Sequence, residues 1–318
     1  TGVFEVLPVD YNVILNAPDV KMIYHDGTRF TATLTDKKGN PIRDAAIEIT
    51  INGRSYDKIT DEKGSVSLGL NLDSGIYSVV VKFKGLLNYT PITKYANVTI
   101  EPTVKGLDVV KMFRNNTQYY AIFTDSQGNF LKNKNIQFNI NGVFYTRTTN
   151  DKGIAMMNIN LNPGKYVITS KNLVTGEQSG NNITVKSLIV QKDLTKHYLN
   201  ASKFQTTIYN KDGSLAVNKE VTFNINGVLY TRKTDSKGAA SLAINLRPGE
   251  YIITTMFDGL SIGNKVKVLP TLVTHDLNMK YMDGSRFTAQ TLDGQGKPLA
   301  NQNVSFNVTG VFYHRITD

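Results

Sequence analysis

The sequence predicts an all-β protein built from tandem units of about 85 residues, each folded as a β-sandwich. Three observations lead to this prediction. One block of sequence recurs at a nearly fixed spacing, apolar and polar residues alternate inside that block, and no window shows an apolar period of 3.6 residues over ten or more residues. With 318 residues, of which 40% are hydrophobic, the chain is large enough to form several packed cores.

The recurring block is clearest in the segments 136–153 (IQFNINGVFYTRTTNDKG) and 221–238 (VTFNINGVLYTRKTDSKG). A weaker copy lies at 47–64, and a fourth begins at 304. The equivalent turn glycines are spaced by 89, 85 and 83 residues: Gly53, Gly142, Gly227 and Gly310. A Lys-Gly turn and a Gly-x-Tyr strand start keep the same spacing in the three longer copies, so the chain is a tandem array.

The block itself predicts a β-hairpin. Val221, Phe223 and Ile225 alternate with polar residues, which is typical of a half-buried strand. Asn226-Gly227 then separates this run from a second one, and a type I′ turn favours Asn-Gly because it needs positive φ at both positions. Counting outward from the turns predicts these cross-strand pairs on the core face: Ile225–Val228, Phe223–Tyr230, Ile140–Val143 and Phe138–Tyr145.

The remaining elements of the unit follow in order. The segment TDSKG at 234–238 predicts a polar turn, and the alternation over 240–246 predicts the next strand. Pro248-Gly249 predicts a second turn before another strand, and 203–209 reads as a strand that precedes the hairpin. Roughly seven short strands with turn signals every 8–12 residues are typical of an immunoglobulin-like β-sandwich.

Corresponding junctions at 96–109, 181–194 and 264–277 contain no Gly/Ser-rich linker. We therefore expect each last strand to run directly into the next unit, and the units to form an elongated rod. The predicted divisions are 1–18 (the last strand and junction of a preceding repeat), 19–103, 104–188 and 189–271 (three immunoglobulin-like repeats), and 272–318 (the first half of a further repeat). The chain is expected to be an excerpt of a longer protein.

Composition narrows the function. The absence of Cys excludes disulfides, thiolate metal sites and cysteine nucleophiles, and only four His are present. We find no GxSxG segment, no Ser/His/Asp arrangement and no recurring carboxylate pair, so the sequence predicts no enzyme, no cofactor and no metal site. No apolar stretch approaches the roughly 20 residues that span a bilayer, so no transmembrane segment is predicted in this portion.

The net charge is +10, which is compatible with an anionic partner such as a wall polymer. The basic residues are scattered, however, and no run exceeds a pair. No nucleic-acid recognition signature accompanies them, so nucleic acid is not predicted as a partner. Solvated strand faces and turns account for most of this charge.

The run FNINGxxYTRxTDxKGxAxLxINLxPGxYxI, read across 223–253, resembles the Ig-like repeats of large bacterial and archaeal surface proteins. It is similar to invasin/intimin-type modules and especially to the adhesin-like proteins of methanogenic archaea. The resemblance implies an extracellular rod of stacked domains at the cell surface, and it implies no catalytic residue.

Three kinds of candidate site were weighed. The TDxKG turns superficially suggest calcium, but Asx turns explain a single Asp or Asn there better. The Tyr-x-Arg pairs of the hairpins read as a Tyr beside a cation whose stem lies over it. Seven Asn-x-Ser/Thr sequons are possible N-glycosylation sites: Asn88, Asn97, Asn115, Asn182, Asn200, Asn303 and Asn307.

The resulting prediction is a non-catalytic structural or adhesive stalk of an extracellular cell-surface protein. Its partners would be neighbouring repeats and, through weak multivalent contacts, a surface glycan or an anionic wall polymer. Two alternatives stay open. The chain could be a subunit of a self-assembling surface fibre, with the half-repeat at 272–318 completed by a strand such as 1–8 of another copy. The repeats could instead be polysaccharide-binding accessories of a larger surface enzyme, although the outward aromatic residues Phe144 and Phe312 are interrupted by Ser55 and Leu229.

Overall fold

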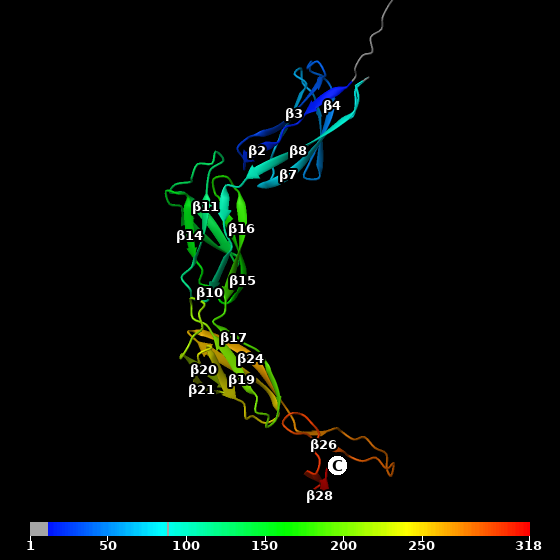
Figure 1. The fold of residues 1–318 in the computed structure, drawn as a ribbon, viewed down its shortest axis with the longest axis vertical. Helices are drawn as coiled ribbons and strands as arrows, with labels where there is room; N and C mark the ends of the chain where they lie inside the picture. The colour runs from blue at the N-terminus through cyan, green and yellow to red at the C-terminus, as the bar shows by residue number, and fades with distance from the viewer. Residues whose placement is uncertain (1–11, 88) are drawn as a thin grey trace, which may run out of the picture. The chain divides into compact units, whose positions relative to one another are not determined.

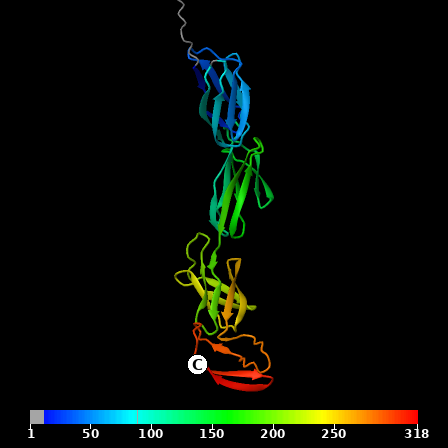
Figure 2. The same ribbon diagram turned by 90° about the vertical axis from the view of Figure 1, so that its right-hand side faces the viewer.

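The computed structural model describes residues 12–87 and 89–318, and all regular structure in those ranges is β-strand. The fold class is therefore all-β, as the sequence predicts. Within the same ranges, no helix has the length and apolar character needed to cross a membrane. Figures 1 and 2 trace the strands from two directions.

The first sandwich places a three-stranded sheet, of order β1-β3-β6, against a five-stranded sheet, of order β2-β8-β7-β4-β5. Sequence neighbours are thus divided between the two layers, as in immunoglobulin-like domains. Its strands are β1 (Val13–Asn16), β2 (Val20–Ile23), β3 (Arg29–Asp36), β4 (Ala46–Ile51), β5 (Arg54–Ile59), β6 (Ser65–Gly69), β7 (Gly75–Phe83) and β8 (Ile92–Glu101).

The same arrangement is repeated twice. The second sandwich pairs β9-β11-β14 with β10-β16-β15-β12-β13, and the third pairs β17-β19-β22 with β18-β24-β23-β20-β21. The strands of the second are β9 (Val104–Gly106), β10 (Val109–Met112), β11 (Gln118–Phe123), β12 (Asn135–Ile140), β13 (Val143–Thr148), β14 (Ile154–Asn158), β15 (Gly164–Lys171) and β16 (Gln178–Lys186). Those of the third are β17 (Ile189–Gln191), β18 (Leu194–His197), β19 (Lys203–Ile208), β20 (Glu220–Ile225), β21 (Val228–Lys233), β22 (Ala239–Ala243), β23 (Gly249–Phe257) and β24 (Leu260–Leu269).

The last part of the chain forms two two-stranded sheets. One joins β25 (Leu272–Thr274) to β26 (Ala289–Thr291), and the other joins β27 (Asn303–Val308) to β28 (Val311–Ile316). By residue contacts, the described chain divides into two compact units. The first holds 12–109, 116–159 and 165–184, and the second holds 110–115, 160–164 and 185–318.

The opening strand of each sandwich is split between the two sheets. In the third, β17 pairs antiparallel with β19, whereas β18 pairs parallel with β24. In the first, β1 pairs with β3, and β2 pairs parallel with β8. Through this pairing, β1 contributes the buried side chains Val13 and Leu15 to the core of the first sandwich. The unit borders given above stay predictions, and residues 1–11 lie outside the described residues.

The cores follow from the alternation of the strands. In β20, Val221, Phe223 and Ile225 are buried while their neighbours are not, which is the pattern of a strand with one face on a core. Phe223 meets Phe204 of the facing sheet edge-to-face, with 6.1 Å between ring centroids. In the second sandwich, Tyr119 and Phe138 make the corresponding contact at 5.4 Å.

The predicted hairpin register is confirmed. Ile225 is opposite Val228 and Phe223 is opposite Tyr230, and Asn226 and Gly227 have φ values of 51° and 77°. The four pairs do not all lie in the core, however. Val228 is 49% exposed, because β21 is the edge strand of its sheet. The matching position in β13, Val143, is 50% exposed for the same reason.

Side-chain hydrogen bonds to the backbone hold the turn of the TDxKG segment. The Thr234 hydroxyl is buried, donates to the carbonyl of Ala216 and accepts the N–H of Lys219. Asp235 Oδ1 accepts the N–H groups of Lys237 and Ala239 at 2.8 and 2.9 Å, so the predicted Asx turn is confirmed. The same carboxylate or amide oxygen bonding occurs at Asp61 and Asn150.

Candidate interaction and modification sites

The described sequon asparagines occupy two kinds of position. Four lie within strands and are exposed: Asn97, Asn182, Asn303 and Asn307. Two lie in turns, Asn115 after β10 and Asn200 after β18. Asn88 lies outside the described residues.

The two turn asparagines use their carboxamides in hydrogen bonds. Asn115 Nδ2 donates to the carbonyl of Lys211 at 2.8 Å. Asn200 Nδ2 donates to the carbonyl of Gly294 at 2.6 Å and to Gln295 Oε1 at 3.0 Å. Since Nδ2 is the atom that carries an N-linked glycan, a sugar at either position would compete with these bonds.

Among the strand asparagines, Asn182 is also engaged. Its Nδ2 donates to Asp108 Oδ2 at 3.0 Å, and its backbone N–H donates to Asp108 Oδ1 at 2.8 Å. At Asn97 the backbone N–H donates to Asp19 in the same way, at 2.7 Å, and its side chain is exposed. At Asn307 the amide oxygen accepts the N–H of Gly310.

These bonds belong to a recurring aspartate that joins the opening and closing strands of each sandwich. In the third sandwich, Asp193 Oδ1 accepts Asn264 Nδ2 at 2.6 Å and the N–H of Lys265 at 3.0 Å. These hydrogen bonds, that of the Asn264 amide first, lower the pKa of Asp193 from its ordinary value. The amide and backbone N–H of Asn182 likewise lower the pKa of Asp108.

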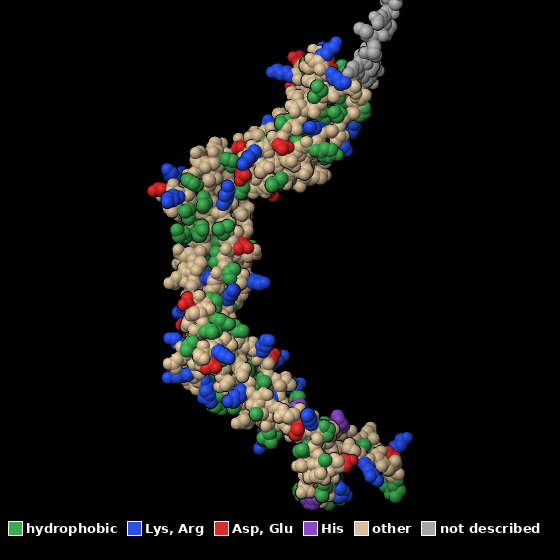
Figure 3. All heavy atoms as spheres, viewed as in Figure 1, with side chains coloured by type: hydrophobic (Ala, Val, Ile, Leu, Met, Phe, Trp, Pro, Cys, Tyr) green, Lys and Arg blue, Asp and Glu red, His purple; other side chains and the backbone are tan. Residues whose placement is uncertain are grey.

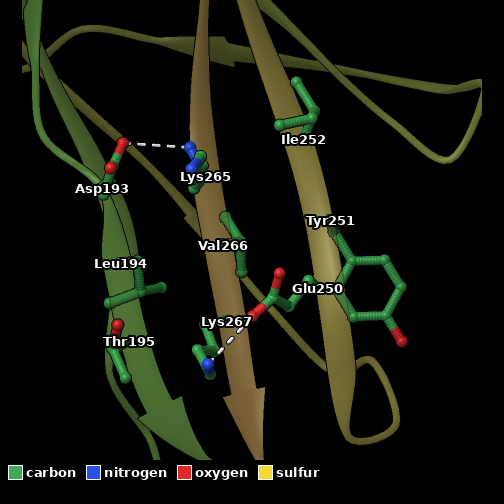
Figure 4. Close-up of a pocket in the computed structure, with 9 residues that line it drawn as sticks. All are labelled: Asp193, Leu194, Thr195, Glu250, Tyr251, Ile252, Lys265, Val266 and Lys267. Carbon is green, nitrogen blue, oxygen red and sulfur yellow. Dashed lines mark hydrogen bonds and ion pairs between the residues drawn. The ribbon is translucent and has the colours of Figure 1, made fainter.

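A shallow groove lies beside this aspartate, over β18, β24 and β23 (Figure 4). Glu250 and Lys267 form an ion pair across it at 2.9 Å, and Asp193 is bonded to the Lys265 N–H at its upper end. Tyr251 donates its hydroxyl to the carbonyl of Arg247 at 2.8 Å. Glu250 and Lys267 are thus paired with each other, and Asp193 is held by hydrogen bonds to uncharged groups. The nine residues that line the groove include no Ser, Cys or His to act as a nucleophile or an imidazole base.

Among the described residues, no three His, Asp or Glu side chains come together in a group that could hold a metal ion. On the face shown in Figure 3, Lys and Arg side chains are scattered among polar and apolar ones, as the sequence predicts.

The Tyr-x-Arg pairs have the predicted structural arrangement. The guanidinium of Arg147 lies 5.7 Å from the ring centroid of Tyr145, and that of Arg232 lies 5.9 Å from Tyr230. Each Tyr is half-buried at the rim of its sheet, and each Arg is exposed. Outward on the same hairpins, Phe144, Leu229 and Phe312 are each more than 60% exposed, and the aromatic series is interrupted at Leu229.

Sequence reasoning missed a buried lysine in the opening strands. Lys196 is 6% exposed, and its Nζ donates to the carbonyls of Ile244 at 2.9 Å and Ser202 at 3.3 Å. Burial lowers its pKa. Lys196 lies three positions after the recurring aspartate, and the residue at the same position in the first sandwich is the buried Met22. This apolar residue was the sequence signal that the position faces the core.

A second buried polar cluster was also missed. Glu177 is 4% exposed and its Oε2 accepts the backbone N–H and the hydroxyl of Thr103, both at 2.5 Å. Asn172, fully buried beside them, donates its Nδ2 to the carbonyl of Thr124 at 2.9 Å. Because the loop 172–177 has no counterpart of similar sequence in the other repeats, internal alignment offered no signal for this cluster.

No protein-family model matches the chain. The inverse autotransporter adhesin YeeJ of Escherichia coli (strain K12) is 20% identical over 364 residues, which cover 96% of this chain. The match spans only 15% of the length of that protein.

Solved structures with related folds include a Ca2+-stabilized adhesin with which an Antarctic bacterium binds ice. It is 16% identical, covers 96% of this chain and 88% of its own, and has a TM-score of 0.21. An I-band fragment of titin is 12% identical, covers 81% of this chain and 97% of its own, and has a TM-score of 0.23. The repeated sheet order of the described strands is that of immunoglobulin-like sandwiches. The sequence of the chain is similar to that of an adhesin.

Proposed function

We propose that this chain is a non-catalytic, adhesive stalk segment of a larger protein held at the outer surface of a cell. The observation that carries the proposal is the similarity to an adhesin along 96% of the chain, in tandem sandwiches of one architecture. The recurring hairpins, turns and aspartates support a repeated scaffold rather than a single site. The stalk would display a distal binding region or contribute weak contacts that add up along its length.

The partners that fit this role are neighbouring repeats and a surface glycan or anionic wall polymer. The net charge of +10 supports an anionic polymer, bound loosely because the basic residues are dispersed. The fibre and the polysaccharide-binding accessory remain alternative proposals. Neither has a specific feature in its favour, since the aromatic series is interrupted at Leu229 and the segment 1–8 lies outside the described residues.

Surface labelling of the source organism tests the location. An antibody raised against this chain is expected to label intact cells, and the native protein is expected to have a mass well above 35.3 kDa. Labelling only after permeabilisation would overturn the proposal.

A binding experiment tests the adhesive role. Beads coated with the chain are expected to adhere to purified cell walls or surface polysaccharide, with adhesion that rises steeply with coating density. The matched control is beads coated to the same density with an unrelated protein of similar net charge. Equal adhesion of both, or loss of all adhesion at about 0.15 M salt, would leave only non-specific charge attraction and contradict the proposal.

A further inference from the structure

In each sandwich, the outer strand of the hairpin forms one edge of the five-stranded sheet. The equivalent edge of another repeat or of another copy could form backbone hydrogen bonds with it. In the second and third sandwiches that edge is β13 and β21, and among the described strands each hydrogen-bonds to a neighbour on one side only. The block that contains them is the same in 136–153 and 221–238 at twelve of eighteen positions. Edges of similar sequence on one chain are present at high local concentration and can match in register, which makes edge-to-edge pairing a hazard.

The two-residue turn determines which backbone groups this edge exposes. Ile140 and Val143 flank the turn and form a hydrogen-bonded pair, and Phe138–Tyr145 is the next such pair. The intervening residues, Phe144, Thr146 and Thr148, therefore point their N–H and C=O groups away from β12. Thr146 is the middle one, so any pairing that uses two or more of these residues in sequence needs its carbonyl.

An arginine covers that carbonyl. Arg147 Nη1 donates to the carbonyl of Thr146 at 2.8 Å. Arg232 does the same to Thr231 at 2.8 Å, and Arg315 to His314 at 2.7 Å. The contact of Arg147 and Arg232 with the rings of Tyr145 and Tyr230 holds the guanidinium in place at the rim.

We propose that Arg147, Arg232 and Arg315 prevent this edge from pairing antiparallel with the same edge of a second copy or of another repeat. The guanidinium occupies the middle acceptor of the edge and places a positive charge in the plane where a new strand would lie. Two such edges brought together would lose both arginine bonds and set two like charges side by side. The first hairpin has Lys58 at this position, and its ammonium has no planar fork to span ring and carbonyl together.

The test uses the full chain with Arg147→Ala, Arg232→Ala and Arg315→Ala combined. Sedimentation velocity over a concentration series is expected to show that the variant associates at concentrations about tenfold lower per edge than the wild type does. The factor corresponds to roughly one additional hydrogen bond between the paired edges. Backbone amides of Phe144 and Thr146 are expected to become protected from hydrogen exchange. The matched control is Lys63→Ala, Lys152→Ala and Lys237→Ala, which removes the same charge from exposed turn positions and should sediment as the wild type does.

A second variant separates the arginine bond from its charge. With all three arginines changed to Lys, the charge stays but the fork is lost, and association is expected to lie between wild type and the Ala variant and to rise with salt. This variant also serves if the Ala variant loses its circular dichroism signal. Sedimentation identical to wild type in the folded Ala variant, or in the Lys variant at high salt, would overturn the proposal.

Discussion

At the scale of single residues, the glycine that closes each TDxKG turn has a positive φ and lies against a backbone carbonyl. Gly238 has a φ of +67°, and a Cβ added there would lie 2.8 Å from the carbonyl oxygen of Ile208. Gly64 and Gly153 have φ values of +68° and +69° and meet the carbonyls of Leu34 and Phe123 in the same way. Both the backbone conformation and the space therefore require glycine.

We expect Gly238→Ala to destabilise the chain by about 2–4 kcal/mol, because backbone strain and a carbonyl clash add. Gly227→Ala is the control, since Gly227 has a φ of +77° but open space around it, and only strain of about 1–2 kcal/mol is expected. Differential scanning calorimetry of the full chain measures both. Equal shifts in Tm would mean that the Ile208 carbonyl does not constrain the turn.

The recurring aspartates make stability depend on acidity. Hydrogen bonds lower the pKa of Asp108 and Asp193 in the folded protein, so their stabilisation is complete above the unfolded pKa of about 3.9 and is lost as the pH falls through the lower folded values. Tm is therefore expected to fall below about pH 4. The double variant Asp108→Asn and Asp193→Asn should have a lower Tm at neutral pH and a shallower decline in acid. A parallel decline in both proteins would contradict this assignment.

At the scale of elements, a buried threonine fastens each hairpin to the loop before it. Thr234 Oγ1 bonds to the Ala216 carbonyl and the Lys219 N–H, and Thr149 and Thr60 make the equivalent bonds in the other sandwiches. Thr234→Val keeps the shape but leaves the buried carbonyl of Ala216 and the partly buried N–H of Lys219 without this partner. We expect a loss of about 2–4 kcal/mol, measured as a lower Tm. The control variant Thr231→Val, on the exposed strand, should change Tm little. An equal fall in Tm for both variants would contradict the role assigned to the Thr234 hydroxyl.

The features that were predicted correctly from the sequence are those that depend on a short local pattern. The Asn-Gly turns, the cross-strand pairs and the Asx turns each depend on a few adjacent residues. The exposure of Val228 was not predictable from the hairpin alone, because it depends on which strand lies at the edge of the complete sheet. The split opening strand was missed for a related reason, since β17 and β18 follow each other in sequence but pair in different sheets.

The candidate sites were less predictable than the fold. A sequon is a three-residue pattern, and it says nothing about whether the asparagine is bonded elsewhere, as Asn200 is to the Gly294 carbonyl. The burial of Lys196 was not predictable from the sequence, because it depends on distant carbonyls such as that of Ile244. The arginine contacts to the edge carbonyls likewise need side-chain geometry that alternation does not contain.

At the scale of the whole molecule, these bonds predict which sequons are used. In protein purified from its native source, peptide mapping by mass spectrometry is expected to find added sugar at Asn97, Asn303 or Asn307 before Asn115 or Asn200. The reason is that the carboxamides of Asn115 and Asn200 are already donated to backbone carbonyls. Higher occupancy at Asn200 than at Asn97 would contradict this order.

The parallel pairing of β18 with β24 has a mechanical consequence. The chain enters the third sandwich through β17 and β18 and leaves it through β24, so tension applied to the two ends would slide these neighbours in opposite directions. Their hydrogen bonds, together with those of Asp193 to Asn264 and Lys265, would then carry the load side by side and have to break together rather than one after another. Because the chain has no Cys and therefore no disulfide, these bonds between β18 and β24 would determine the force at which a stretched sandwich unfolds.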